Sequence, residues 1–153
     1  MLTLGDTAPD FTSPRDGGQM VTLSDLAPRN VVLYFYPKDD TPGCTTEAIA
    51  FTALMNEFEA ANCTVLGVSK DNVTKHEKFR TKHDLDVILI SDEASTICED
   101  YGVWVEKNMY GKTYMGIERA TFLIGSDGKI VQIWRKVKVP QHAEAVLDAV
   151  KAL

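Results

Sequence analysis

Long apolar runs and an N-terminal targeting pattern are both missing from this chain. No stretch of its 153 residues approaches the roughly 20 consecutive apolar residues of a membrane-spanning helix. The first basic residue is Arg15, so the chain does not begin with a charged segment followed by an apolar core, and no secretory signal is predicted. We therefore expect a cytoplasmic protein that does not insert into a membrane.

An excess of positive charge and a disulfide framework are also missing. The sequence has 16 Lys and Arg against 22 Asp and Glu, a formal net charge of −6, which disfavours binding to nucleic-acid phosphates. Its three cysteines are an odd number, unlike the paired cysteines of small secreted proteins. The chain contains no internal repeat, low-complexity segment or Pro/Gly/Ser-rich linker, so residues 1–153 are predicted to form a single domain.

Strand-like and helix-like patterns alternate along the chain. The predicted strands are 31–36, 64–69, 87–90, 119–124 and 129–135, and the predicted helices are 45–60, 72–82, 94–101 and a last helix opening at Pro140. Pro14-Arg15-Asp16-Gly17-Gly18 predicts a hairpin near the start, Ser24 is expected to cap a short turn, and Ser126-Asp127-Gly128 should join the last two strands. This order predicts an α/β protein with a central mixed β-sheet, helices on both faces and an N-terminal β-hairpin.

The most informative segment is Pro37-Lys38-Asp39-Asp40-Thr41-Pro42-Gly43-Cys44. It follows a run of apolar and aromatic residues and precedes a predicted helix, so Cys44 lies at or within the first turn of that helix. Unpaired backbone N–H groups and the helix dipole favour negative charge there, and a thiol so placed tends toward the reactive thiolate. The segment therefore predicts a nucleophile in a rigid loop rather than a cysteine that only packs in the core.

The pattern Pro37-x-x-x-Thr41-x-x-Cys44 resembles the peroxidatic cysteine motif of the peroxiredoxins. Residues 31–39 and 66–71 resemble the Q-type branch of that family, also called bacterioferritin comigratory proteins, and residues 7–11, 101–104 and 116–124 continue the resemblance in order. The resemblance covers nearly the whole chain. It implies a thioredoxin-like fold and a thiol peroxidase without a cofactor, which acts on hydrogen peroxide and organic hydroperoxides in antioxidant defence. We expect a monomer or a weak homodimer.

Peroxide reduction needs a stabilised thiolate, donors that hold the peroxide in line and positive charge for the developing oxyanion. The backbone N–H groups near Gly43 and Cys44 are expected to supply some of these donors. The Thr41 hydroxyl is expected to contact both peroxide oxygens, and Pro37 to shield the sulfur from water. No arginine lies near this segment in the sequence.

The resemblance supplies the missing cation, because Arg119 matches an arginine that family members carry near the start of a later strand. Glu47, one turn after Cys44, is expected to pair with Arg119 in a bidentate geometry and to orient its guanidinium. The alternatives are a surface arginine at a strand edge and an ordinary first-turn glutamate that complements the helix dipole.

The chain departs from the family pattern at the second, resolving cysteine. Ile49 stands where many Q-type peroxiredoxins carry it, five residues after the first cysteine, and the predicted helix 72–82 has none. Cys63 and Cys98 are expected to pack in the core, since Cys98 could reach Cys44 only if its short helix or the active-site loop unwinds. The sequence therefore predicts a one-cysteine enzyme that is recycled by an external thiol such as thioredoxin, with Cys98 as the alternative resolving residue.

The remaining polar candidates are interpreted as structural. His76, His83 and His142 show no metal-ligand spacing and are expected at the surface. Asp39 and Asp40 are expected to cap and solvate the loop, so no metal is assigned. An aromatic and methionine-rich region could wall the active site, form a partner surface or simply pack, and it comprises Trp104, Met109, Tyr110, Tyr114 and Met115.

Two other functions compete with the peroxidase. A disulfide oxidoreductase of the thioredoxin type needs a second cysteine close behind the first, but Cys44 is followed by Thr45, Thr46 and Glu47. A redox sensor or holdase would use the same motif without catalysis. Steady-state peroxide turnover with a thiol donor separates the peroxidase from the sensor, because a sensor would be oxidised once and stop.

Overall fold

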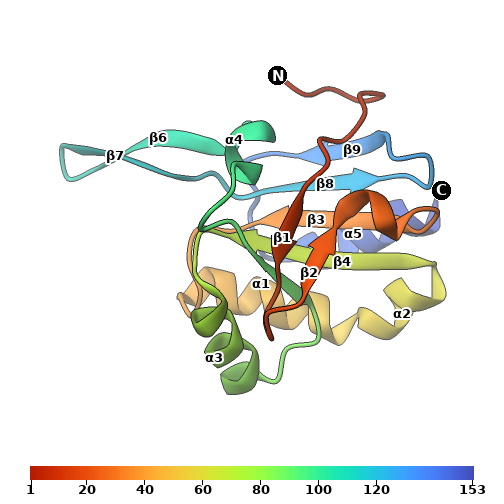
Figure 1. The fold of residues 1–153 in the computed structure, drawn as a ribbon, viewed down its shortest axis with the longest axis horizontal. Coiled ribbons are helices and arrows are strands. Elements are labelled where there is room, and N and C mark those ends of the chain that lie inside the picture. The colour runs from red at the N-terminus through yellow and green to blue at the C-terminus, as the bar shows by residue number, and fades with distance from the viewer.

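The computed structural model describes residues 1–153 and is built around a five-stranded sheet in the order β5-β4-β3-β8-β9 (Figure 1). β3, β4 and β5 run parallel, whereas β8 lies antiparallel between β3 and β9. The strands are β3 (Asn30–Phe35), β4 (Cys63–Ser69), β5 (Ile88–Ser91), β8 (Ala120–Ile124) and β9 (Ile130–Trp134). The predicted mixed central sheet is confirmed.

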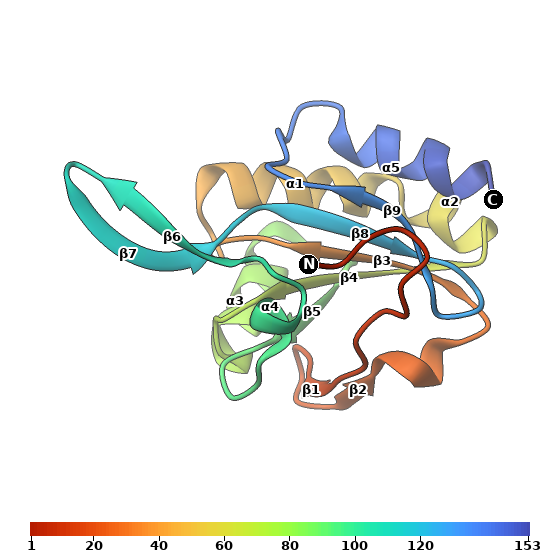
Figure 2. The ribbon, with the colours of Figure 1, turned by 90° about the horizontal axis from the view of Figure 1, so that it is seen from above.

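Helices cover both faces of this sheet, as predicted. In Figure 2, α1, α2 and α5 lie along one side, and α4 lies on the other side together with the N-terminal hairpin of β1 and β2. α3 packs beside the β5 edge and contributes Phe79 to the same apolar cluster as α1. The bounds are α1 (Pro42–Ala53), α2 (Met55–Ala60), α3 (Val73–His83), α4 (Ile97–Asp100), α5 (His142–Lys151), β1 (Thr12–Pro14) and β2 (Met20–Thr22).

β3 explains how the site is held at the centre of the molecule. Its side chains alternate between two core clusters, with Tyr34 facing α1 and Phe35 facing α4. Every residue from Val31 to Tyr36 is buried, and each fully buried apolar side chain of this size contributes roughly 1.5–3 kcal/mol. The loop that follows β3 therefore starts from a strand that is buried on both faces.

Three local predictions differ from the structure. The predicted helix 45–60 begins earlier, at Pro42, and is divided at Leu54 into α1 and α2. The last helix begins at His142 rather than at Pro140, because Gln141 has left-handed backbone angles. Ser24 does not cap a turn, since it lies inside the 3-10 helix Leu23–Leu26 and donates its backbone N–H to Asp10.

A second hairpin was not predicted. β6 (Trp104–Met109) and β7 (Lys112–Ile117) pair only with each other and extend beyond the end of the central sheet (Figures 1 and 2). Tyr110 and Gly111 connect them, both with positive φ, as two-residue hairpin turns require. The tip of this aromatic and methionine-rich region is exposed, while Trp104 packs against the core at its base. None of the helices has the length and apolar composition needed to cross a membrane.

Candidate active site

Cys44 lies in the first turn of α1, directly after the loop that leaves β3. Thr41 has extended backbone angles and precedes the helix, and Pro42 is its first residue, a position where the missing N–H of proline costs nothing. The Thr45 N–H donates to the Thr41 C=O, so the N–H groups of Gly43 and Cys44 have no helical partner. The sulfur is buried, since Cys44 is only 2 % exposed.

Arg119, the residue just before β8, brings positive charge to this sulfur. Its Nη2 donates to Cys44 Sγ at 3.3 Å, and its Nη1 donates to Glu47 Oε1 at 2.6 Å. Gly43 makes room for the guanidinium, because a Cβ at this position would lie 3.2 Å from Nη2. The structure thus brings Cys44, Glu47 and Arg119 together. The pairing of Glu47 is not bidentate as expected, because the second guanidinium nitrogen is used on the sulfur and Glu47 Oε2 has no partner.

Glu47 and Arg119 form a buried ion pair beside the sulfur. Burial raises the pKa of Glu47 to about 7, while Arg119 lowers it. Burial alone would lower the pKa of Arg119, but Glu47 and Cys44 raise it, so the guanidinium stays charged. Because Glu47 is paired with Arg119, its charge is offset where it lies one helical turn from the sulfur.

Thr41 and Pro37 lie in the loop next to this cluster, but neither is shown in contact with the sulfur. The Thr41 hydroxyl donates to the Lys38 C=O at 2.8 Å, so it would have to leave this bond to donate to a peroxide. Pro37 is exposed. The roles assigned to both residues remain predictions.

The prediction that all three histidines lie at the surface is wrong for His76 and His142. His76 is fully buried, and its Nδ1 lies 2.6 Å from a carboxylate oxygen of Asp39, which is buried as well. Asp39 therefore does not solvate the loop as expected, because its carboxylate is used inside the protein. Spacing could not reveal this pair, since its two members are 37 residues apart.

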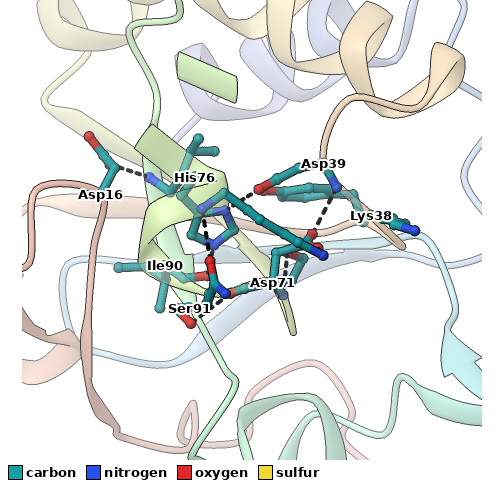
Figure 3. A network of polar contacts seen from close by, with 12 residues as sticks. Asp16, Lys38, Asp39, Asp71, His76, Ile90 and Ser91 are labelled. Carbon is teal, nitrogen blue, oxygen red and sulfur yellow. Dashed lines mark hydrogen bonds and ion pairs between the residues drawn. The ribbon is translucent and has the colours of Figure 1, made fainter. Parts of the chain in front are cut away.

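Asp39, Asp71 and His76 bring their side-chain ligand atoms within 4.8 Å of one another, a spacing that a metal site would also show. Here each group already has a protein partner. His76 holds Asp39, the Tyr36 hydroxyl donates to Asp39 Oδ1 at 2.6 Å, and the Asp39 N–H donates to Asp71 Oδ2 at 2.8 Å (Figure 3). The cluster has the geometry of a buried ion pair with its hydrogen bonds satisfied.

His142 lies behind Arg119 at the start of α5. Its Nε2 is 2.8 Å from Thr121 Oγ1, and its ring packs edge-on against Phe51 and Trp134. Burial lowers the pKa of His142 to about 4, and the positive charge of Arg119 adds a smaller effect in the same direction. His142 is therefore neutral in the folded protein over most of the pH range and adds no competing charge to the site.

His142→Gln should make the protein less sensitive to acid. The unfolded chain takes up a proton near pH 6.5 and the folded protein only near 4, so the free energy of unfolding falls as pH drops through this window. The difference between these two pKa values corresponds to as much as about 3 kcal/mol of unfolding free energy. The wild type should lose this stability as pH drops, and His142→Gln should keep it. Urea unfolding at the two ends of the window tests this, with His83→Gln as the control. Parallel losses in wild type and His142→Gln would contradict it.

Lys107 is a cation close to the site that could not be identified from the sequence, because the hairpin that carries it was not predicted. It lies on β6 opposite Tyr114, and its aliphatic stem passes over Gly116, where a Cβ would lie 3.2 Å from Lys107 Cδ. Burial and the charge of Arg119 lower the pKa of Lys107, whereas Cys44 raises it. Lys107 in the middle of β6 is thus a further cation whose charge interacts with those of Arg119 and Cys44.

The other two cysteines are buried away from this cluster. Cys63 faces Asn30 at the opposite end of β3, about 17 Å along the strand from the loop that leads to Cys44. Cys98 belongs to the apolar cluster on the other face of the sheet from Cys44. Burial raises the pKa of Cys63 to about 12 and that of Cys98 still further. All three cysteines are free thiols.

Comparisons with known proteins agree on one family. Residues 4–133 match the model of the AhpC/TSA family. The chain is 52 % identical over 143 residues to peroxiredoxin Bcp of Xanthomonas campestris pv. campestris, covering 94 % of this chain and 89 % of that protein. It is 50 % identical over 146 residues to a putative peroxiredoxin bcp of Coxiella burnetii, covering 95 % and 97 % of the two chains.

A solved structure supports the same relationship. It is a structure of the bacterioferritin comigratory protein of Xanthomonas campestris, from a study of that protein's alkyl peroxide reduction activity. It superposes on this chain with a TM-score of 0.91 at 48 % identity. The match covers 99 % of this chain and 96 % of that one. Other structures of the same protein include serine mutants at two different cysteines. By sequence and fold, the chain belongs to the peroxiredoxin family, in the group of the Bcp, or Q-type, peroxiredoxins.

Proposed function

We propose that this chain is a thiol peroxidase that reduces hydrogen peroxide and organic hydroperoxides through a sulfenic acid on Cys44. The observation that carries the proposal is the hydrogen bond from Arg119 Nη2 to Cys44 Sγ at 3.3 Å, formed at the N-terminus of α1. A guanidinium and a helix N-terminus both stabilise a thiolate and the negative charge that develops on a peroxide oxygen. The biological role is antioxidant defence.

In the proposed reaction the Cys44 thiolate attacks one oxygen of the peroxide and the O–O bond breaks. The sulfur is oxidised by two electrons and becomes a sulfenic acid, while the other oxygen takes up a proton and leaves as water or an alcohol. Arg119 and the N–H groups of Gly43 and Cys44 hold the peroxide and its developing charge. Thr41 would turn its hydroxyl from Lys38 to the substrate, and Pro37 would limit the access of water.

We propose that an external thiol, such as that of thioredoxin, returns Cys44 to its reduced state. The donor sulfur attacks the sulfenic sulfur, water leaves, and a second thiol of the donor releases Cys44 from the mixed disulfide. Two observations support a one-cysteine enzyme. α3 contains no cysteine, and Cys98 lies across the sheet from Cys44 with a raised pKa that keeps it protonated.

The remaining proposals concern the setting of the enzyme. We propose that residues 1–153 act as a single domain, because the family model and the compared relatives span most of the chain. The chain would work as a monomer or weak homodimer in the cytoplasm, where a reducing environment returns the cysteine to its thiol. Peroxide consumption at steady state, with thioredoxin and its reductase as donor, tests the function. Oxidation that stops after one equivalent would instead support a redox sensor.

The one-cysteine proposal predicts that Cys63→Ser/Cys98→Ser keeps most of its turnover with a small-molecule dithiol. Both thiols are buried and neither approaches Cys44, so the donor attacks the sulfenic acid directly. Without an internal partner, that acid should also persist and rise to the sulfinic state under excess peroxide. The measurement is the rate of peroxide loss, followed by intact mass.

Cys98→Ser with thioredoxin as donor decides whether Cys98 resolves Cys44. If this single substitution stops turnover, and non-reducing gels show a Cys44–Cys98 bond in the wild type, the one-cysteine proposal is wrong. Cys63→Ser serves as the matched control for loss of a buried thiol.

A further inference from the structure

Two consecutive aspartates of the active-site loop are each bound by a histidine of α3. His76 Nδ1 lies 2.6 Å from Asp39 Oδ2, and His83 Nε2 lies 2.8 Å from Asp40 Oδ1. Seven residues make about two helical turns, so both histidines lie on the same face of α3. Asp39 and Asp40 belong to the loop between β3 and α1 that ends at Cys44. α3 therefore holds the segment that positions the nucleophile.

His76 and Asp39 together hold one proton more than a neutral imidazole beside an ionised carboxylate would hold. His76 Nε2 lies 3.0 Å from the Ile90 C=O, which can only accept, so this nitrogen carries hydrogen. Its Nδ1 faces a carboxylate oxygen of Asp39, and the other oxygen already accepts from the Tyr36 hydroxyl (Figure 3). The 2.6 Å contact between Nδ1 and Asp39 requires a proton between them, and the raised pKa of His76 favours that proton on the ring, as an imidazolium beside a carboxylate.

Several charged or titratable groups surround this pair. Tyr36 and Asp71 bind Asp39 directly, while the next charged groups bind one another, Lys75 with Asp71 and Arg80 with Asp16. Burial raises the pKa of Tyr36 well above its usual value, so that hydroxyl stays protonated. Burial would lower the pKa of His76, but the hydrogen bond and charge of Asp39 outweigh it, with Asp71 adding to the same effect, and the pKa is raised.

The loop has two tasks that require different conformations. Arg119 can donate to the sulfur only while the loop holds Cys44 in place. In this conformation Cys44 is 2 % exposed, so the thiol of a protein reductant cannot reach its sulfenic acid until the loop opens. We propose that His76 is a positioning residue of the peroxidase reaction, which holds Asp39, and with it the closed loop, through the proton that lies between the two side chains. This inference rests on the proposed role of Cys44.

The direction of the pH dependence follows from the raised pKa of His76. The ion pair is fully formed below the ordinary histidine value of 6.5 and is lost as pH rises through the raised value in the folded protein. The rate of Cys44 oxidation should therefore decline as pH rises through this value, a loss that we call the alkaline decline and that approaches about tenfold per pH unit.

Asp39→Asn keeps the hydrogen bonds of His76 but removes the need for its second proton. The asparagine amide can donate to a neutral His76 Nδ1 while its oxygen accepts from Tyr36, and His76 Nε2 keeps its bond to the Ile90 C=O. This variant should react with hydrogen peroxide at neutral pH as the wild type does, but without the alkaline decline. The measurements are single-turnover oxidation of Cys44 and hydrogen exchange of residues 37–44, corrected for intrinsic exchange, across the pH range.

Asp84→Asn is the matched control, because it removes the same charge at the exposed end of α3, where asparagine tolerates the left-handed backbone. It should keep the alkaline decline of the wild type. A second variant, His76→Asn, can still donate to Asp39 but carries no charge. Its loop should lose protection already at neutral pH, with no further alkaline loss.

An equal alkaline loss of loop protection in wild type and Asp39→Asn would overturn the inference, as would the absence of such a loss in the wild type. Peroxide consumption distinguishes this failure from that of the function. If the wild type consumes no peroxide, the proposed peroxidase is wrong, while hydrogen exchange still decides whether the proton of His76 holds the loop.

Discussion

Replacement of Cys44 with serine should abolish peroxide consumption and leave the fold intact. The sulfur is the only atom at this site that can form the sulfenic acid, and a serine hydroxyl in its place cannot be oxidised by peroxide in the same way. The substitution changes one buried atom at the start of α1, so the thermal unfolding transition should remain cooperative. Peroxide loss is measured at steady state with a thiol donor present.

Cys63→Ser is the control for this experiment, because it removes another buried thiol at the far end of β3. This variant should consume peroxide at close to the wild-type rate. More than a small residual activity in purified, folded Cys44→Ser protein would show that Cys44 is not the reacting residue.

Arg119→Ala should slow the oxidation of Cys44 by about 10²-fold or more, the usual effect of losing one donor to a developing oxyanion. The variant loses the guanidinium bond to Sγ and leaves Glu47 without the cation that it faces at 2.6 Å. We also expect a smaller thiolate fraction at neutral pH, which ultraviolet absorbance of the thiolate measures. Stopped-flow mixing with hydrogen peroxide gives the rate.

Arg29→Ala removes an arginine at the opposite end of β3, where its Nη2 pairs with Glu59 at 2.8 Å, and it should leave the rate unchanged. Arg119→Lys keeps the charge but not the planar fork that reaches both Sγ and Glu47, so its rate should lie between those of wild type and Arg119→Ala. An unchanged rate together with an unchanged thiolate fraction in Arg119→Ala would remove Arg119 from the mechanism.

The fold could be predicted wherever burial leaves a pattern in the sequence. β3 is buried on both faces and therefore reads as an unbroken apolar run from Val31 to Tyr36. The hairpin of β6 and β7 has solvent along much of both faces, so it shows neither an apolar run nor clear alternation, and it was missed. The division of the first helix at Leu54 could not be predicted either, because no proline or glycine lies at that position.

The site could be predicted only as far as local spacing and family resemblance reach. Cys44 and Glu47 lie on one turn of α1, and spacing alone suggests that they interact. Arg119 was placed by resemblance, because it is 75 residues from the sulfur. The pair of Asp39 and His76 was interpreted wrongly, since partners brought together by folding leave no signal in a single sequence.

Oxidation of the purified protein with one equivalent of hydrogen peroxide, without any reductant, tests the central claim most directly. Peptide mass spectrometry after trapping with a reagent specific for sulfenic acids identifies the cysteine that has reacted. We expect a sulfenic acid on Cys44, with Cys63 and Cys98 still as free thiols and no disulfide formed. Unmodified Cys44 beside an oxidised Cys63 or Cys98 would contradict it.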